Sequence, residues 1–524
     1  MNKRKKNILL VCIYAVMLLL CFLIVLLLQK VHSPHTKDGD DNKATESTAV
    51  PYTEEEPETK DSRETFSAAE TEQSTKEAIR PSLPRPTIMA TEESKEEEKP
   101  YQPPVIVIAS DVHYFSPELT DYGEAFGKLE KLDDGKVVRY IPQIMDAFTD
   151  QMEKKKPAAV ILSGDLTLNG EKKGHEALAE KLAVLEEKGV KVLVIPGNHD
   201  INNHAAASYF GKEKEPIQEA NEKDFYDIYR RFGYDQARSL DQNSLSYVYE
   251  LDEKNWLLMV DSAQYEPYNK VGGRIKEETL DWMKTQLEEA KKLGVSVVVI
   301  AHHNLLKESI LYPEDCTLEN SQEVVRLLES YRIPLYISGH LHLQKTKTYK
   351  QEPGEKGADY HISEVVANSF AISPNQYGVL TWTGDNRLIY TTERTDVEDW
   401  GKKTGTTDEN LLSFSGYAEK SLKDVVYEQV SSQIKNLPKE QIEEMAKLYG
   451  DLNSDYCAGR PIDAREIKST TAFRLWQRNL PDSRLFAQID QILRDTASDH
   501  NTWEGRTEET KEEDSDEDDR EQTP

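Results

Sequence analysis

Five short apolar runs, rich in β-branched residues, are each followed directly by polar side chains that can bind a metal ion. Runs of about four to eight such residues predict buried strands. Stretches with helical spacing separate several of them, at 174–189 and 277–294. Strands that alternate with helices predict an α/β architecture with covered sheets. The runs lie at 105–110, 158–164, 191–197, 295–301 and 334–339, and the polar residues that follow them are Asp111, His113, Asp165, Asn198, His199, Asp200, His302, His303, His340 and His342.

The place of these side chains at strand ends predicts that they meet. In open α/β sheets, ligand sites gather just beyond the carboxyl ends of the strands. Nitrogen and oxygen donors without thiolates suit manganese, iron, zinc or cobalt rather than a structural zinc site. Gly164, Gly197 and Gly339 would let the backbone turn tightly, so that the side chains converge. Because each motif alone also fits an ordinary turn, the prediction depends on all five together.

The series DVH, GDLTLNG, GNHD, HH and GHLH resembles the signature of the calcineurin-like metallophosphoesterase family, block by block and in the same order. The resemblance covers about residues 104–396 and implies a four-layer α/β/β/α sandwich around two sheets. Four further strand-like runs between 345 and 396 would fill the second sheet. The intact GNHD and the short first block resemble the bacterial phosphodiesterase branch of the family, which includes cyclic-nucleotide phosphodiesterases.

The resemblance also implies a dinuclear metal centre of two divalent or transition metal ions, with manganese, iron and zinc as the candidates. His302 is expected to be the ligand of the His302–His303 pair, whereas His303 would line the pocket, support a ligand or only pack. Two ions lying about 3.5–4 Å apart repel each other, so they need a shared carboxylate. By resemblance, Asp111, His113 and His342 bind the first ion, Asn198, His302 and His340 bind the second, and Asp165 bridges the two.

Two neighbouring residues of the GNHD block are implied to act on the substrate rather than on the metals. His199 would face the phosphoryl group and stabilise its charge or protonate the leaving oxygen. Asp200 would hold the His199 ring. The reaction implied is phosphoester hydrolysis by a hydroxide bound to both metals, with phosphoesters, nucleotides among them, as substrates. A phosphodiesterase is favoured; a phosphomonoesterase, such as a nucleotidase or phosphatase, and a non-catalytic surface binding protein are the alternatives.

Other residues of this region have simpler interpretations. The insertion at 114–136 contains four aromatic residues, which pack together or form a wall for a base; packing is favoured. His175 is expected on the exposed face of its helix. Cys316 and Cys457 are expected to be free thiols, since four cysteines are too few for a disulfide framework.

The N-terminal part predicts a membrane anchor. Residues 8–28 form an uncharged apolar run, long enough for a membrane helix, and four basic residues precede it at 3–6. Basic residues favour the cytoplasmic side, so 1–7 would be a cytoplasmic stub and the catalytic domain would lie outside the cell. A cleaved signal peptide is the alternative. The lipid bilayer is thus an expected partner, and the chain is expected to be a single-pass protein of the cell membrane.

The remaining segments complete the predicted organisation. Residues 29–100 are rich in Ser, Thr, Glu and Pro and predict a disordered stalk. The metallophosphoesterase domain is expected at 101–400, and helical spacing predicts a small all-α extension at 405–503. The acidic residues of 504–524 predict a disordered tail. The net charge of −30 argues against binding a nucleic-acid polymer.

Overall fold

The computed structural model of the protein describes residues 101–307, 314–349 and 361–507. The predicted cytoplasmic stub, membrane anchor and stalk lie outside the described residues, and so does the tail from residue 508. Among the helices that are described, none combines the length and the apolar character that crossing a membrane requires.

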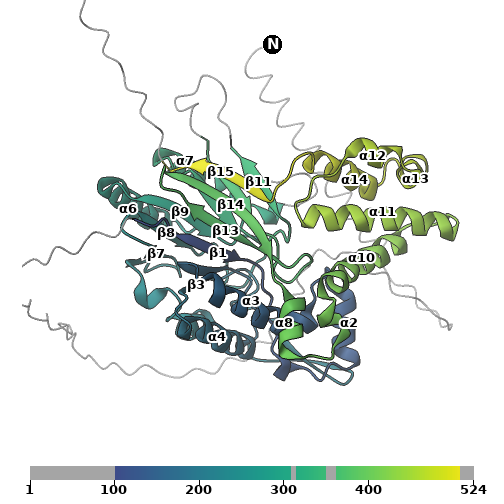
Figure 1. The fold of residues 1–524 in the computed structure, drawn as a ribbon, viewed down its shortest axis with the longest axis horizontal. Helices are drawn as coiled ribbons and strands as arrows, with labels where there is room; N and C mark the ends of the chain where they lie inside the picture. Colours follow the sequence, from purple (N-terminus) through teal and green to yellow (C-terminus); the bar gives the residue numbers. More distant parts are fainter. Residues whose placement is uncertain (1–100, 308–313, 350–360, 508–524) are drawn as a thin grey trace, which may run out of the picture. The chain divides into compact units, whose positions relative to one another are not determined.

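Two sheets form the centre of the described part (Figure 1). The six-stranded sheet has the order β15-β14-β13-β1-β2-β3, and the seven-stranded sheet has the order β11-β12-β10-β9-β8-β7-β6. The strands, including a separate hairpin of β4 and β5, are β1 (Val105–Ala109), β2 (Ala159–Ser163), β3 (Val192–Ile195), β4 (Ala207–Phe210), β5 (Glu213–Pro216), β6 (Ser239–Leu240), β7 (Tyr247–Glu250), β8 (Asn255–Val260), β9 (Ser296–Ala301), β10 (Leu335–Ser338), β11 (Lys345–Thr348), β12 (Ser363–Val366), β13 (Gln376–Trp382), β14 (Arg387–Arg394) and β15 (Thr502–Arg506).

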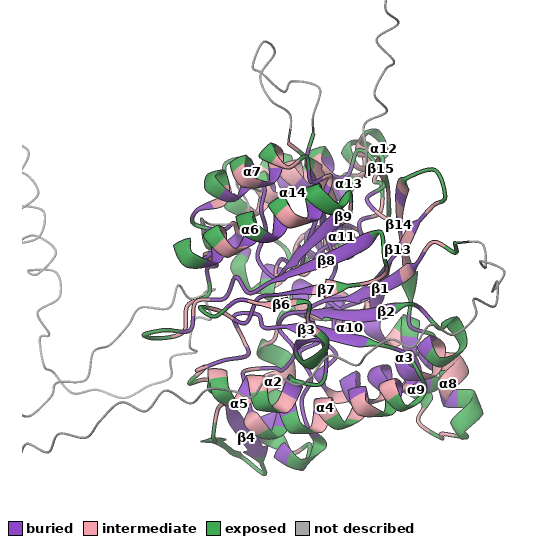
Figure 2. Ribbon diagram, turned by 90° about the vertical axis from the view of Figure 1, so that its left-hand side faces the viewer, coloured by how far each residue is buried: buried purple, intermediate pink, exposed green. Residues whose placement is uncertain are grey.

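Helices cover both outer faces of the paired sheets (Figure 2). Helices α3 (Ile141–Lys155) and α4 (Lys172–Glu187) lie on the six-stranded sheet, and α6 (Glu277–Leu293) and α7 (Ser321–Ser330) lie on the seven-stranded sheet. Apolar side chains of both sheets pack between them in one core. The mixed α/β class predicted from the sequence is therefore confirmed. The shorter helices of this part are α2 (Glu124–Leu132), α5 (Glu222–Tyr229), and the 3-10 turns η1 (Pro117–Leu119), η2 (Val138–Tyr140), η3 (Tyr234–Gln236) and η4 (Glu314–Cys316).

Helix α6 illustrates how the sequence sets these elements. Met283, Leu287 and Ala290 recur at three- and four-residue intervals and are buried against the seven-stranded sheet. Two lysines occupy the last turn, where positive charge complements the helix dipole. Gly294 then adopts φ 67°, and this left-handed residue ends the helix just before β9.

All five apolar runs form the expected strands, but they divide between the two sheets. β1, β2 and β3 are parallel neighbours in the six-stranded sheet, whereas β9 and β10 are parallel neighbours in the seven-stranded sheet. The expectation that every strand between 345 and 396 lies in the second sheet is wrong. β11 and β12 do so, but β13 pairs with β1, with Val107 opposite Val379, and β14 pairs with β13.

A helical segment lies between β14 and β15. Its helices are α8 (Val397–Thr404), α9 (Glu409–Leu412), α10 (Phe414–Gln433), α11 (Lys439–Cys457), α12 (Ala464–Ser469), α13 (Thr471–Asn479) and α14 (Arg484–Asp495). Its core is continuous with apolar residues of the α/β part, among them Leu343 and Val366. Residues 504–506 are not disordered as predicted: β15 pairs with β14, with Ile389 opposite Glu504. The charged strand is held there by its backbone pairing and by an ion pair between Glu504 and Arg387 of 2.8 Å.

Candidate metal centre

The first group of predicted ligands comes from both sheets. Asp111 and His113 follow β1, and His342 follows β10. The Nε2 atoms of His113 and His342 lie 3.0 Å apart, and the His342 Nε2 lies 3.4 Å from an Asp111 carboxylate oxygen. The structure thus brings together three side chains that the resemblance assigns to one metal ion.

The second group lies beside the first and shares Asp165 with it. The Nε2 atom of His302 is 3.2 Å from Oδ1 of Asn198 and 3.3 Å from Oδ2 of Asp165. The same Asp165 oxygen is 3.9 Å from Nε2 of His113, a member of the first group. The His340 ring is 5.2 Å from the His302 ring, centroid to centroid. Asp165 therefore stands between two sets of donors, as a bridging carboxylate must.

The hydrogen bonds around His302 show that this donor set fits a cation. Its Nδ1 lies 3.0 Å from the Ser163 carbonyl oxygen, which can only accept, so Nδ1 carries a proton and donates. In the neutral ring, Nε2 then directs a lone pair at the amide oxygen of Asn198 and the carboxylate of Asp165. Three electron-rich atoms that converge in this way need a positive charge among them. Nitrogen and hard oxygen donors suit a divalent first-row metal ion.

Without a metal, protons supply that charge. Burial lowers the pKa of His302, but the Asp165 carboxylate outweighs it and raises the pKa to about 9. For His342, burial again lowers the pKa, but the Asp134 carboxylate outweighs this effect and raises the pKa to about 10. Both rings therefore hold protons at neutral pH in the metal-free protein, and metal binding must release them.

Five of the predicted ligands adopt left-handed backbone conformations, which are costly for residues other than glycine, at about 1–3 kcal/mol each. Backbone hydrogen bonds hold these turns: the Asp111 N–H donates to Gly164, and the His113 N–H donates to Asp165. Such strained positions cluster where the surrounding structure imposes them, often at functional sites. The φ angles are 52° for Asp111, 47° for His113, 47° for Asp165, 70° for His340 and 54° for His342.

Two glycines of the motifs are required by close approach rather than by an unusual φ. A Cβ atom on Gly197 would lie 2.3 Å from the Asp165 carboxylate, and one on Gly339 would lie 1.8 Å from the Ser110 hydroxyl oxygen. Neither glycine has a positive φ. Both glycines also begin tight turns, as expected, because their carbonyl oxygens accept from the N–H groups of Asp200 and Leu341. Their missing side chains let ligand-bearing loops touch one another.

His199 lies at the mouth of the site, as expected for a residue that faces substrate. Its side chain is 31% exposed, and its Nε2 is 4.0 Å from Asp165. The prediction that Asp200 holds the ring is wrong: His199 Nδ1 donates to the Leu168 carbonyl oxygen at 2.7 Å. Asp200 is fully buried and its carboxylate accepts from the backbone N–H groups of Leu166, Thr167 and Gly197, so it joins the GDLTLNG and GNHD turns.

Two further histidines are placed by their hydrogen bonds. His175 is fully buried, so its predicted exposure is wrong; its Nε2 contacts the Asp200 carbonyl oxygen at 2.9 Å and its Nδ1 contacts the Tyr229 hydroxyl at 3.0 Å. The two ring nitrogens of His303 are occupied by the Ser262 hydroxyl and the Val271 carbonyl. Because His302 keeps Nε2 for the site, it is the better ligand of the pair.

Asp134 is a member of the site that the motifs did not indicate. It belongs to the insertion that follows β1, and its carboxylate accepts from His342 Nδ1 at 3.0 Å. Lys136 is buried beside it and pairs with both Asp133 and Asp134. A carboxylate behind a ligating histidine fixes the ring and raises its basicity. The only signal in the sequence is the pair of aspartates in LDDGK, next to a turn glycine.

The aromatic residues of the same insertion pack with one another. Phe126 contacts Phe115 and Tyr122, with ring centroids 5.9 Å and 5.2 Å away, and it also approaches Tyr209 of β4. Phe126 is fully buried, while Tyr122 remains 38% exposed beneath Arg139. The favoured packing interpretation is therefore confirmed.

The helical segment supports the loop that carries His340 and His342. The Gln344 N–H donates to the Cys457 carbonyl at the end of α11, and its side chain donates to the His500 carbonyl. Asn501 in turn donates to the carbonyl of Gly459. The irregular stretch after α11 thus lies against the chain just beyond the ligands. Neither Cys316 nor Cys457 forms a disulfide bond in the described part of the chain, which agrees with the prediction of thiols.

Comparison with known proteins agrees with this geometry. Residues 104–344 match the model of the calcineurin-like phosphoesterases. The α/β part of the chain is therefore similar to the calcineurin-like phosphoesterases. Residues 396–499 match a second model, the C-terminal domain of cyclic nucleotide phosphodiesterase. These matches support a phosphoric ester hydrolase, and both matched regions lie in the described part of the chain except for residues 308–313.

Individual relatives match more distantly. A probable cyclic nucleotide phosphodiesterase of Vesicomyosocius okutanii is 22% identical over 184 residues, and a probable glycerophosphodiester phosphodiesterase of Arcobacter nitrofigilis is 28% identical over 200 residues. These matches cover 35% and 38% of this chain and 61% of each relative. Among solved structures, a dimetal phosphatase of Danio rerio has 13% identity and a TM-score of 0.37, covering 55% of this chain and 95% of that one.

Proposed function

We propose that this chain is a metal-dependent phosphodiesterase. The observation that supports it most is the convergence of two donor groups on Asp165, at the carboxyl ends of β1, β2, β3, β9 and β10, where a dinuclear centre would lie. Both relatives are named as phosphodiesterases, and the family model that matches residues 396–499 is named after cyclic nucleotide phosphodiesterase. A diester substrate is therefore favoured over a monoester.

The chain's own residues would divide the work of the reaction. When bound, two metal ions would polarise the phosphoryl oxygens and lower the pKa of an attacking water, and manganese, iron and zinc fit the donor set. His199 is the half-buried group beside the centre that is free to meet substrate. With its Nδ1 proton held by Leu168, its Nε2 can donate a proton to the leaving oxygen when the ring is protonated.

The fixed elements behind these groups determine where they point. Asp200 clamps two ligand loops through backbone N–H groups, and His175 binds the Asp200 carbonyl from behind. Asp134 fixes the His342 ring. Because ligand positions must hold to within a fraction of an ångström, we infer that these contacts preorganise the centre before substrate arrives.

The location of the enzyme is a separate proposal. The uncharged apolar run at 8–28 and the basic residues before it favour a retained anchor with the catalytic domain outside the cell. Labelling of intact cells with a membrane-impermeant reagent at a cysteine placed on exposed Lys292 would test it. Labelling only after lysis would place the domain inside.

The activity is tested by parallel assays on bis(p-nitrophenyl) phosphate and p-nitrophenyl phosphate with added Mn²⁺. We expect faster turnover of the diester, loss of activity after EDTA treatment and recovery with Mn²⁺. Asp165→Asn should abolish both activities, whereas Asp385→Asn, an exposed carboxylate in the β13–β14 turn, should not. Faster turnover of the monoester would favour a phosphomonoesterase, and full activity in Asp165→Asn would contradict the dinuclear centre.

A further inference from the structure

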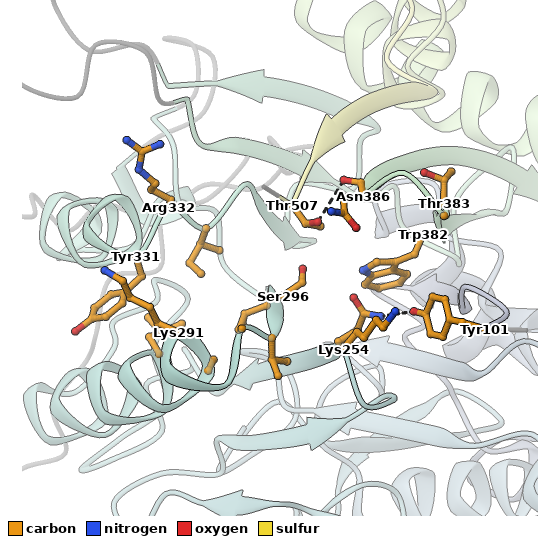
Figure 3. Close-up of a pocket in the computed structure, with 18 of the residues that line it drawn as sticks. Tyr101, Lys254, Lys291, Ser296, Tyr331, Arg332, Trp382, Thr383, Asn386 and Thr507 are labelled. Carbon is orange, nitrogen blue, oxygen red and sulfur yellow. Dashed lines mark hydrogen bonds between the residues drawn. The ribbon is translucent and has the colours of Figure 1, made fainter. Parts of the chain in front are cut away.

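A cavity lies away from the predicted metal ligands, at the end of β9 opposite to the one that His302 follows (Figure 3). Its volume is about 570 Å³. β8 and β9 begin there, at Asn255 and Ser296, and β13 ends there at Trp382, whereas His302 follows the other end of β9. The size is that of a site for a small organic molecule. No part of the proposed catalytic function accounts for this cavity.

The charge of the cavity contrasts with that of the chain. Lys254, Lys291 and Arg332 line it, and among its described lining residues none is acidic. The whole chain carries a net charge of −30. Lys254 is held at the mouth because its Nζ lies 4.2 Å from the centre of the Tyr101 ring, a cation–π contact. A locally positive cavity in an acidic protein favours an anionic ligand.

Two polar groups in the wall have no protein partner. The Trp382 Nε1 and the Ser296 Oγ are buried, and neither forms a hydrogen bond within the part of the chain that the structure describes. The Trp382 residue is only 5% exposed, and Figure 3 shows its indole nitrogen turned toward the cavity. Leaving a buried donor unpaired costs about 1–3 kcal/mol, so an acceptor in the cavity would be bound favourably.

Part of the wall is apolar. Leu287, Val297 and Ile333 line the cavity together with Trp382. Such a surface contributes affinity by burying an apolar group, while the few polar groups fix its orientation. The cavity thus combines hydrogen-bond donors, positive charge and an apolar wall.

From this combination we propose that the cavity binds a small organic anion with an apolar, flat body. Its carboxylate or phosphate group accepts hydrogen bonds from Trp382 and Ser296 and pairs with Lys291, and its body lies against the apolar wall. This site is separate from the metal centre and does not depend on the proposed function. It offers a place where a metabolite can bind without competing for the catalytic metals.

The test uses the full chain and two probes, para-fluorobenzoate and para-fluorophenylphosphonate, followed by fluorine NMR. The phosphonate has no ester bond to hydrolyse. We expect both to bind, with the tighter one identifying the preferred head group. Trp382→Phe, which keeps an aromatic ring but loses the indole N–H, and Lys291→Gln, on the helix surface, should each weaken binding about tenfold. Lys292→Gln, its exposed neighbour outside the cavity, should leave the affinity unchanged.

Three results would overturn the proposal. The first is no binding of either probe at millimolar concentration. The second is binding that neither Trp382→Phe nor Lys291→Gln weakens, which would place the probes elsewhere. The third is binding of the phosphonate alone that disappears with EDTA, which would place it at the metal centre. Because Lys291 is exposed, its variant remains informative even if Trp382→Phe fails to fold.

Discussion

The α/β part and the helical segment contribute to the metal centre in different ways. Every predicted ligand comes from the α/β part, from loops at strand ends with left-handed residues such as Asp165. The helical segment supplies no predicted ligand, yet it binds the main chain of Gln344, two residues beyond His342, and shares a core with Leu343. The comparison teaches that part of the support for the predicted ligands comes from a separate stretch of sequence. Four substitutions test this division.

The largest effect is expected at His199. Its substitution distinguishes residues that bind metal from residues that act on the substrate within the α/β part. His199→Gln removes the proton donor beside Asp165 while leaving the predicted ligands in place. We expect kcat to fall by about 100- to 10,000-fold, with metal content unchanged. Steady-state kinetics together with metal analysis would measure both. Loss of metal in this variant would show that His199 belongs with the ligands after all.

The next effect tests whether the helical segment is independent of the α/β part. Trp476 is fully buried in the helical core and donates to the Met445 carbonyl. Trp476→Ala should lower the free energy of unfolding by about 3–5 kcal/mol. Because this core is continuous with Leu343 and Val366, metal release and loss of helix should shift together in denaturant. Phe148→Ala, at a buried position in α3, is the matched control. If helix is lost before metal is released in the Trp476 variant but not in the control, the helical segment folds as a separate unit.

Asp134 tests support that comes from inside the α/β part itself. Asp134→Asn keeps an acceptor for His342 Nδ1 but removes the charge that makes the ring a stronger ligand. We expect metal affinity to fall by about 10- to 100-fold, measured by titration into the metal-free protein. Asp121→Asn, in the same insertion and exposed, should change nothing. An unaltered affinity in Asp134→Asn would remove Asp134 from the site.

The smallest effect is expected at Glu171, a buried residue near the ligand loops that is not itself a predicted metal ligand. Burial raises the pKa of Glu171 from its ordinary value of 4.5 to about 7. The folded state therefore holds this proton longer than the unfolded state does, so stability falls as pH rises from 4.5 to 7. Glu171→Gln removes the charge, and we expect it to stabilise the fold by about 1–2 kcal/mol at pH 8 and by little at pH 5. Thermal unfolding at the two pH values would measure this; equal gains at both would show that ionisation is not the cause.

The sequence was sufficient for the five strands that precede the predicted ligands, and for the gathering of these side chains at the strand ends, because both depend on local pattern. Apolar runs predict β1, β2 and β3, and each ligand stands directly after such a run. Contacts between distant segments were not predictable in this way. Asp134 meets His342 across 208 residues, and nothing near either residue indicates the pairing. His175 appeared exposed because its helix is polar on several sides, and only the fold shows which side meets Asp200.

The strand β15 was missed for a related reason. The β15 sequence, TWEGR, contains no apolar run. It forms a strand because it pairs with the free edge of β14. The distribution of strands between the two sheets was also beyond local pattern, since β13 is antiparallel to β1 although the paired residues Val105 and Thr381 lie 276 positions apart in the sequence. Pairing of this kind is decided by the whole fold rather than by either strand.

The return of the chain to the sheet at β15 makes the helical segment an insertion with two covalent attachments. Deleting everything from Val397 onward would leave β14 as a bare edge, whose unpaired N–H and C=O groups invite association with a second chain. Exchange of helical segments among related enzymes would therefore preserve the sheet only when both junctions are kept.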